Sequence, residues 1–399
     1  MKVLLISFEF GEQVLGGLGR VINGLTRELR QHAVLDVYLL YFNPSRLAIS
    51  AKVLRCDAQR WGEEVATFTR GYARHCVEQI RRERYDLVHF FSVHWIIGKV
   101  IDEIRRELPE QKLVYSVHSL IKHEQGIRLN PDSFLACERK LLESASWIHV
   151  LNDTTRAYLE QAYPDFADKP CSAIPNGVTM SDFVPRDDRF RAELQQRLRP
   201  QTFTVACLSR WAHGKGLEHL LQAAERLLAA GYDMQFVLAG RKYISWEKRF
   251  YAYVSKIQRM SGRLGSRSLI LGWLNAPQRN TLFELADVCV MPSELEYYPY
   301  SVLEPIAARL PLVCSDLACV RELFADGRDC SLFRTGCADD LAQKLVECQA
   351  APARRRQMAR RAHEAIARRC NWQPIALEYA QMYRNALLLP AAQPELGAA

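Results

Sequence analysis

The sequence has no pair of cysteines separated by two residues, and no cysteine stands beside histidine at the spacing of a zinc site. Its 12 cysteines are scattered, and Cys207, Cys289 and Cys314 lie in apolar, strand-like segments. A reduced cysteine in such a segment behaves as a small hydrophobic residue. We therefore expect neither a disulfide framework nor a structural metal site, and we expect a reducing, cytosolic compartment.

A long hydrophobic run is also missing. No stretch of about 18 apolar residues occurs, so the sequence predicts no membrane-spanning helix. The chain enters a strand-like segment at Lys2, which leaves no room for a signal peptide and predicts a cytoplasmic protein. The apolar content of 49% and the charged content of 25% are typical of a globular enzyme.

Two ligand-binding motifs are absent as well. The sequence contains no Asp-x-Asp, which argues against a diphosphate held by a metal. It contains no G-x-G-x-x-G, which argues against a nicotinamide dinucleotide and hence against an oxidoreductase. We therefore expect no metal and no other cofactor.

Positive charge is in modest excess, with 53 basic and 45 acidic residues and a net charge of +8. Seven arginines of this excess share one helical stretch: Arg354, Arg355, Arg356, Arg360, Arg361, Arg368 and Arg369. The stretch is either a solvated helix face or a surface for an anionic partner, whether a phospholipid bilayer, polyphosphate or nucleic acid. Nucleic acid is disfavoured because no nucleic-acid-binding motif accompanies the charge.

What is present is an alternation of strand-like and helical segments, typical of parallel βαβ units. The length of 399 residues suits two such domains, and the polar stretch 185–189 separates them. In the first half we predict strands at Val3–Phe8, Asp36–Phe42, Leu87–Ser92, Leu113–His118, Trp147–Asn152 and Ser172–Pro175. In the second half we predict them at Phe203–Ser209, Met234–Ala239, Leu269–Gly272, Val288–Met291 and Leu312–Ser315.

Two carboxylates flank a predicted strand-to-helix junction. Glu296 and Glu304 stand eight positions apart, after the strand Val288–Met291 and around the start of a helix. The unpaired amides of a helix N-terminus are a natural seat for phosphate or sugar oxygens. We expect Glu304 in the first helical turn, where it could accept hydrogen bonds from a diol, and Glu296 at the mouth of the loop. Alone, the pair could equally be a capping acid and a surface acid.

Two further features could bind an anionic ligand, and a third candidate for the site is a lone histidine. Arg210 and Lys215 follow a predicted strand, from which side chains reach the carboxyl edge of a sheet. The loop of Gly16, Gly17, Leu18 and Gly19 permits close backbone approach to an anion, although it could also be a tight turn. His118 ends a predicted strand, a position where a lone histidine is more often structural than catalytic.

Taken in their order along the chain, these segments resemble the retaining family-4 glycosyltransferases of the GT-B fold, with the E-x7-E signature of that family. The resemblance spans nearly the whole chain, because Ile174-Pro175-Asn176-Gly177-Val178 and Gly214-Lys215-Gly216-Leu217 also match. It implies an α/β protein with two Rossmann-like, doubly wound domains facing a central cleft. The acceptor would bind to residues 1–185, and the nucleotide sugar to residues 186–371. The last helix, within 372–390, would cross back to the first domain.

The resemblance also implies roles for individual residues. His118, Arg210, Lys215 and Glu296 would be catalytic, with both cations on the diphosphate and His118 and Glu296 near the donor sugar. The donor would be held further by Gly16, Gly17, Gly19, Trp273, Leu274, Tyr298, Tyr300, Ser301 and Glu304, with Glu304 on the ribose. Here the usual Gly-Phe-Gly of the family is replaced by Tyr297-Tyr298-Pro299. Because proline lacks an N–H group, the usual donor-sugar contact at position 299 cannot form.

We therefore predict a cytoplasmic, metal-independent, retaining hexosyltransferase that uses a UDP- or GDP-linked sugar. The predicted acceptor is a glycan, a glycolipid or a cell-surface polysaccharide precursor, and the basic stretch suggests peripheral contact with the inner face of an anionic membrane. A small natural-product aglycone is the alternative acceptor, and a catalytically weak sugar-binding homologue is the alternative function. No nucleic-acid partner is expected.

Overall fold

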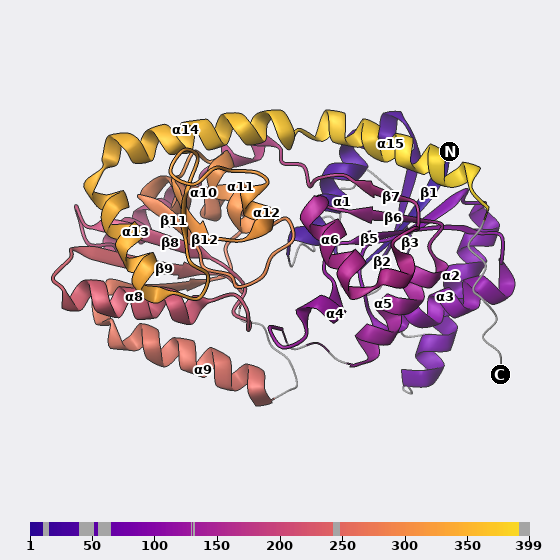
Figure 1. Ribbon diagram of the computed structural model, residues 1–399, viewed down its shortest axis with the longest axis horizontal. Coiled ribbons are helices and arrows are strands. Elements are labelled where there is room, and N and C mark those ends of the chain that lie inside the picture. Colours follow the sequence, from indigo (N-terminus) through magenta and orange to yellow (C-terminus); the bar gives the residue numbers. More distant parts are fainter. Residues whose placement is uncertain are drawn as a thin grey trace. The chain divides into compact units, whose positions relative to one another are not determined.

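The computed structural model describes residues 1–10, 16–39, 52–54, 65–128, 130, 132–241 and 248–390. The described residues form two compact units. One comprises Met1–Gln125, Asn130–Gly177 and Trp372–Ala399, and the other Gly126–Leu129 and Val178–Asn371. Each unit is an α/β structure built on one parallel sheet, as Figure 1 shows, so the predicted fold class is confirmed.

The first unit contains a seven-stranded parallel sheet in the order β3-β2-β1-β4-β5-β6-β7. Its strands are β1 (Lys2–Ser7), β2 (Val34–Leu39), β3 (Lys52–Leu54), β4 (Leu87–Phe90), β5 (Lys112–Val117), β6 (Trp147–Val150) and β7 (Cys171–Ala173). Its helices are α1 (Gly17–Glu28), α2 (Val65–Glu83), α3 (Trp95–Glu107), α4 (Ile121–Glu124), α5 (Asp132–Ser144), α6 (Asp153–Ala162) and α15 (Trp372–Leu388).

All six strands predicted for this half are present, within a few residues at each end, although positions 40–42 of the second one lie outside the described residues. The short edge strand β3 was missed. Three residues are too few to show the alternation by which a strand is recognised in a sequence.

The second unit contains a six-stranded parallel sheet in the order β10-β9-β8-β11-β12-β13. Its strands are β8 (Phe203–Leu208), β9 (Met234–Ala239), β10 (Ser268–Gly272), β11 (Val288–Met291), β12 (Leu312–Ser315) and β13 (Ser331–Phe333). Its helices are α7 (Asp188–Arg197), α8 (Leu217–Ala229), α9 (Lys248–Arg263), α10 (Ala276–Leu285), α11 (Tyr300–Ala307), α12 (Ala318–Arg321), α13 (Ala338–Ala350) and α14 (Pro352–Arg369). The five predicted strands are confirmed, and the three-residue edge strand β13 was missed for the same reason as β3.

The central strands of this sheet are apolar on both sides. Alternate residues of β8 enter different cores, with Val205 and Cys207 in one and Ala206 in the other. Strand β9 behaves in the same way, with Phe236 on one face and Val237 on the opposite face. Helices cover both faces of such a sheet, so its strands read as continuous hydrophobic runs without polar alternation.

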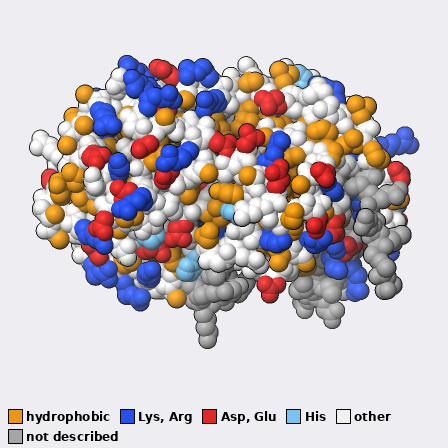
Figure 2. Space-filling model, in the orientation of Figure 1, with side chains coloured by type: hydrophobic (Ala, Val, Ile, Leu, Met, Phe, Trp, Pro, Cys, Tyr) orange, Lys and Arg blue, Asp and Glu red, His pale blue; other side chains and the backbone are white. Residues whose placement is uncertain are grey.

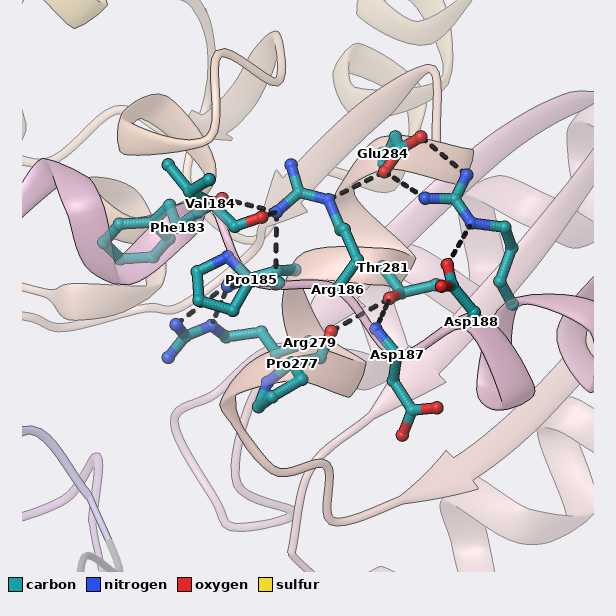
Figure 3. Close-up of polar contacts among 12 residues, drawn as sticks. Phe183, Val184, Pro185, Arg186, Asp187, Asp188, Pro277, Arg279, Thr281 and Glu284 are labelled. Carbon is teal, nitrogen blue, oxygen red and sulfur yellow. Dashed lines mark hydrogen bonds and ion pairs between the residues drawn. The ribbon is translucent and has the colours of Figure 1, made fainter.

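The polar stretch 185–189, which was predicted to be a linker, is held in the second unit by hydrogen bonds and ion pairs (Figure 3). The Arg186 guanidinium donates to the carbonyls of Phe183 and Val184, at 2.5 and 2.7 Å, and pairs with Glu284 of α10 at 2.7 Å. The amide of Asp187 donates to Thr281 Oγ1 at 2.9 Å. The N-terminal part of the first unit therefore ends at Gly177, whereas the polar composition alone predicts a boundary at residue 185.

The last helix, α15, belongs to the first unit, as predicted, and packs on α1 and β5. The indole of Trp372 lies where side chains at Gly24 and Gly177 would otherwise be. A Cβ atom at either glycine would lie 2.2 Å from the ring. These two glycines therefore form the seat of α15.

Candidate active site

In the second unit the predicted site residues gather where the strand order of the sheet reverses. Strands β8 and β11 are neighbours in the sheet but are separated in sequence by β9 and β10. At such a switch point the loops after the two strands diverge and leave room for a ligand at the carboxyl edge. Arg210 and Lys215 lie in the loop after β8, and Glu296 lies in the loop after β11.

The two loops are joined by an ion pair. Lys215 Nζ lies 2.5 Å from Glu296 Oε1, and each side chain is about a tenth exposed, at 10% and 11%. The amide of Glu294 donates to the Gly214 carbonyl at 2.9 Å, so the backbones of the loops are also in contact. Gly216 is required there. Its φ is +64°, and a Cβ atom would lie 1.9 Å from the Pro292 carbonyl oxygen.

Arg128 is a third cation at this site, and the sequence analysis missed it. Its guanidinium donates to the Leu295 carbonyl at 2.7 Å and lies 3.7 Å from Glu296 Oε2. Residues 126–128 precede the rest of the second unit by some fifty positions, yet they pack with that unit. No motif in the sequence marks Arg128, because only the tertiary structure brings it to the loop after β11.

The charges of the cluster alter one another's proton affinities. Burial, helped by the positive charges of Arg128 and Arg210, outweighs the opposing effect of Glu296, and the net result is a pKa of Lys215 lowered to about 8. Burial alone would raise the pKa of Glu296. The charges of Lys215 and Arg128, with hydrogen bonds from Lys215 and Ser293, outweigh burial and hold this pKa below its usual value. The carboxylate is therefore ionised at neutral pH.

Three predicted residues remain after β8 and β10, and two of them are exposed to solvent. The Arg210 side chain is exposed. Trp273 is 59% exposed immediately after β10, whereas Leu274 packs against the smaller of the two cores. An exposed tryptophan beside a sheet's carboxyl edge offers a flat apolar face, which suits a base or a sugar ring.

Glu304 does not lie where we expected. Helix α11 begins at Tyr300, with Pro299 as its N-cap, so Glu304 is in the second turn and the first turn contains no acid. Its carboxylate is paired with Arg279 at 3.1 Å, and both side chains are less than a tenth exposed. The prediction of a first-turn acid stabilised by the helix N-terminus is wrong. The proline starts the helix early, and a buried arginine of α10 neutralises the acid.

The segment that replaces the family's Gly-Phe-Gly is buried. The Tyr298 hydroxyl lies 3.2 Å from Cys370 Sγ, and the side chain is 6% exposed. Tyr300 is 8% exposed, and Ser301 is half-buried in the first turn of α11. Any donor contact of Tyr298 therefore comes from its backbone and not from its hydroxyl.

In the first unit the glycine-rich loop already holds a carboxylate. Glu9 Oε2 accepts hydrogen bonds from the amides of Gly16 and Gly19, at 2.8 and 3.1 Å, at the start of α1, whose first residue is Gly17. A carboxylate at a helix N-terminus is stabilised for the reason that a phosphate would be. The loop can thus bind an anion, but any other anion would have to displace Glu9, a residue that was not predicted from the sequence.

His118 follows β5 directly. Its ring stacks on Phe91, with centroids 5.7 Å apart, and its Nε2 is buried without a hydrogen-bond partner among the described residues. Burial lowers its pKa to about 3, helped by the charge of His149, so the ring is neutral at physiological pH. A buried, unpaired ring nitrogen suits a ring that bonds a ligand. Two other histidines of this unit have structural partners, since His94 caps α3 and His123 stacks on Tyr158.

The described part of the chain meets the requirements of neither a metal site nor a membrane-spanning helix. Within it, no cluster of three or more His, Cys, Asp or Glu side chains is arranged to hold a metal ion. Across the same ranges, no helix has both the length and the hydropathy needed to cross a membrane.

Two family models match the chain. Residues 15–182 match "Glycosyltransferase Family 4", and residues 202–350 match "Glycosyl transferases group 1". Together they match most of both units. The chain therefore belongs to the family-4 glycosyltransferases of the GT-B fold, and the resemblance drawn from its motifs is confirmed.

Individual relatives agree with this assignment. The chain is 25% identical to a D-inositol 3-phosphate glycosyltransferase of Corynebacterium urealyticum, over 99% of this chain and 98% of the relative. It is 24% identical to a GDP-mannose-dependent monoacylated alpha-(1-6)-phosphatidylinositol monomannoside mannosyltransferase of Corynebacterium glutamicum, over 91% and 93%. Its fold is similar to that of Anabaena Alr3699/HepE in complex with UDP-glucose, with a TM-score of 0.78 at 17% identity, over 96% and 100%. The chain is thus a glycosyltransferase.

Proposed function

We propose that this glycosyltransferase moves a hexose from a UDP- or GDP-linked sugar to a glycolipid, a glycan or a polysaccharide precursor, with retention of configuration and without a metal ion. The observation that carries the proposal is the group of three cations, Arg128, Arg210 and Lys215, at the switch point of the second sheet. Cleavage of a nucleotide sugar leaves negative charge on the diphosphate, and fixed cations stabilise this charge without having to reorganise.

The comparisons support a nucleotide diphosphate sugar as the donor class. The Anabaena protein was solved with UDP-glucose, and the Corynebacterium glutamicum mannosyltransferase is described as dependent on GDP-mannose. Both donors carry the diphosphate that the three cations would neutralise. The base and the sugar are left open, because the replacement Tyr297-Tyr298-Pro299 lies where the family contacts the donor sugar.

Retention without a covalent intermediate fits the state of Glu296. A carboxylate nucleophile must be free to attack the anomeric carbon, but Glu296 is held by Lys215 on one oxygen and lies near Arg128 on the other. We therefore assign Glu296 to orientation and charge balance. Front-side attack by the acceptor would need only a positioned donor and a stabilised leaving group.

A lipid-linked acceptor is supported by one relative and by helix α14. The Corynebacterium glutamicum relative is named for a phosphatidylinositol substrate. Arg356, Arg360 and Arg368 of α14 are exposed, and the helix carries a single acid, Glu364. Figure 2 shows Lys and Arg side chains gathered over this helix. Each basic residue near an anionic bilayer contributes about 1 kcal/mol, so several together would suffice for peripheral binding.

Vesicle co-sedimentation tests the membrane part. Vesicles with anionic lipid should retain the protein at low salt, and zwitterionic vesicles should not. Replacing Arg356, Arg360 and Arg368 together by Glu should abolish retention. The matched control replaces by Glu three exposed arginines on other helices, Arg74, Arg189 and Arg259. Anionic vesicles should still retain this control variant. Equal binding by both triple variants would show that α14 is only a solvated face.

Slow hydrolysis of nucleotide sugars tests the catalytic part. The protein is incubated separately with UDP- and GDP-linked hexoses in the presence of EDTA, and released nucleotide is measured. Release from one donor, with the anomeric configuration of the free sugar retained by NMR, is the expected result. Inverted product, or release only with added divalent metal, would refute the proposal.

A catalytically weak sugar-binding homologue is the second candidate, and one observation favours it. The amides of the glycine-rich loop are occupied by Glu9, so the loop is not vacant for a phosphate. This alternative predicts saturable binding of a nucleotide sugar with neither hydrolysis nor transfer. Transfer to a small aglycone, but not to a lipid or a glycan, would instead identify a natural-product acceptor.

A further inference from the structure

A line of buried polar side chains crosses the first sheet beside His118. It contains His89 of β4, Ser116 of β5 and His149 of β6, and all three side chains are fully buried. These strands are neighbours in the order β4-β5-β6. Buried polar groups in a sheet core are costly unless each is satisfied, so such a line needs an explanation.

The line forms a continuous hydrogen-bonded chain with an end on α15. The Tyr383 hydroxyl lies 2.8 Å from His89 Nδ1, and His89 Nε2 lies 2.7 Å from Ser116 Oγ. Ser116 Oγ lies 2.6 Å from His149 Nδ1, and His149 Nε2 lies 2.8 Å from the carbonyl oxygen of Ile174. Four contacts thus join α15 to the residue that follows β7.

The carbonyl at one end determines the direction of every bond. Burial lowers the pKa of His149 to about 4 and lowers that of His89 well below its usual value, so both rings are neutral and each carries one N–H. A carbonyl only accepts, so His149 Nε2 carries the proton and its Nδ1 accepts from the hydroxyl of Ser116. Ser116 has then used its proton and must accept from His89 Nε2.

The other end of the chain is determined in the same way. With its proton on Nε2, the His89 ring has an acceptor at Nδ1, and among the described residues only the phenol of Tyr383 supplies the donor there. Without that hydroxyl, His89 is left with a buried, unsatisfied nitrogen in either tautomer. If the tautomer changes to relieve this, Ser116 must turn its proton towards His89. His149 Nδ1 then loses its 2.6 Å bond from Ser116 and has the longer contact with the Tyr379 hydroxyl, at 3.5 Å, in its place.

His118 is in contact with this chain by three routes. The His118 amide donates to the Ser116 carbonyl at 3.1 Å. Its ring lies edge-on to that of His149, with centroids 6.1 Å apart, and it stacks on Phe91. Phe91 in turn lies against His89, with centroids 4.0 Å apart. The hydrogen-bonded chain therefore sets the orientation of the residues that surround His118.

We propose that Tyr383, His89, Ser116 and His149 are positioning residues that hold His118 in one orientation, with the last hydrogen bond supplied by α15. The inference rests on the proposed function only for the role of His118. It makes the docked terminal helix part of the active site. The hydroxyl of Tyr383 determines which ring nitrogen of His89 and of His149 carries the proton. These rings lie around His118, which is distant from Tyr383 in the sequence.

The test compares two tyrosines of the same helix. Tyr383→Phe removes the ordering hydroxyl. Tyr379→Phe removes the hydroxyl of an equally buried tyrosine one turn earlier, which makes only long contacts, at 3.5 Å, with both ring nitrogens of His149 and does not lie on the path of short bonds from Tyr383 to Ile174. Full-length protein labelled with 15N-histidine reports the tautomers by NMR, and each of the 10 histidines is assigned with a single substitution.

We expect His89 and His149 of the wild type to show Nε2–H tautomers. In Tyr383→Phe the ring signals of His89 and His118 should shift, and in Tyr379→Phe they should not. With substrate, Tyr383→Phe should lower kcat about 10-fold with the donor KM within about twofold, because misplacement of a reacting group can cost up to about 100-fold. Tyr379→Phe should leave kcat within about twofold of the wild type.

An Nδ1–H tautomer at His89 or His149 in the wild type would overturn the proposal. So would His118 signals that respond alike to the two substitutions, or equal kcat values for the two variants. A protein with the expected tautomers and shifts but no transferase activity would refute the proposed function and not the ordered chain. Thermal unfolding of both variants separates lost orientation from lost stability, because each loses one buried hydroxyl.

Discussion

The ammonium of Lys215 and the carboxylate of Glu296 are 2.5 Å apart and nearly buried, although 81 residues separate them in the sequence. The pair joins the loop after β8 to the loop after β11. Breaking a buried pair leaves an uncompensated charge, so substitution of either residue affects the fold as well as the chemistry. This separates Lys215 from Arg210, which lies in the same loop but is exposed.

Arg210→Ala and Lys215→Ala should each lower kcat by at least about 100-fold, the usual loss when one preorganised charge-stabilising group is removed. They should differ in stability. Arg210→Ala should unfold at the wild-type temperature because its side chain is at the surface. Lys215→Ala should lose roughly 3 kcal/mol, because Glu296 remains buried beside a single arginine. Donor turnover and thermal unfolding of both variants provide the check, and near-wild-type transfer by either one contradicts the assignment.

Activity should decline in alkaline solution as Lys215 loses its proton. The pKa of Lys215 is lowered to about 8, so kcat/KM should fall as pH rises through about 8. Stability should change in the opposite direction. The unfolded chain binds the lysine proton up to a higher pH than the folded chain, so the free energy of unfolding rises between the lowered pKa and the ordinary one.

The control for this pH dependence is Lys215→Arg, since an arginine keeps its charge throughout the range. In this variant the alkaline fall in kcat/KM should move to higher pH, whatever the absolute rate. An unchanged alkaline limb would assign the titration to another group.

Glu304→Gln and Glu296→Gln keep size and remove charge, and they should fail differently. Glu304 is proposed to bind the unreactive ribose, so its loss should raise the donor KM and largely spare kcat. Glu296 is proposed to lie nearer the sugar that becomes cationic, so its loss should mainly lower kcat. Titrations with nucleotide diphosphate alone complete the comparison. If Glu296→Gln weakens binding of the bare nucleotide more than Glu304→Gln does, the two roles are reversed.

The ion pair between Glu304 and Arg279 adds a stability readout to this comparison. Both side chains are less than a tenth exposed, so Glu304→Gln leaves a buried arginine with a neutral partner. We expect a loss of roughly 1–3 kcal/mol in the free energy of unfolding, measured by denaturant titration. Arg279→Met, which removes the opposite charge, should be partly rescued by Glu304→Gln in the double variant.

Transfer should persist in excess EDTA. In the proposed function Arg128, Arg210 and Lys215 would supply positive charge to the diphosphate, so no divalent ion would be needed for that purpose. Abolition by EDTA with recovery on addition of magnesium or manganese would show that a metal takes part.

Gly24→Ala should weaken the docking of α15. A methyl group there would lie 2.2 Å from the Trp372 ring, and overpacking of this kind costs about 1–3 kcal/mol. Gly98→Ala is the matched control. It is also a glycine within a helix of the first unit, its nearest neighbour would be Cys137 at 3.9 Å, and alanine should stabilise it by up to about 1 kcal/mol. Limited proteolysis near residue 371 and thermal unfolding compare the two. Equal stability would show that Trp372 is not seated on Gly24.

Much of the fold was predictable because burial leaves a direct trace in the sequence. The strands β8, β9 and β11 are short apolar runs, since helices cover both faces of a parallel sheet, and all three were located within one residue of their observed ends. The edge strands β3 and β13 were missed because three residues carry no period. The helix start at Tyr300 was misplaced because Pro299 acts as an N-cap, a role that the surrounding sequence did not reveal.

The sequence by itself determined the order of βαβ units and the family, because each of these is recorded in local spacing or in a run of a few residues. The same motifs also supplied most of the candidate site residues. The tertiary structure alone decided which charges meet. Arg128 joins Glu296, Arg279 neutralises Glu304, Glu9 occupies the amides of Gly16 and Gly19, and Tyr383 completes a chain of hydrogen bonds towards His118. The physical reason is that hydrogen bonds and ion pairs act over a few ångströms of space, and the folded sheets bring together side chains that are tens to hundreds of residues apart.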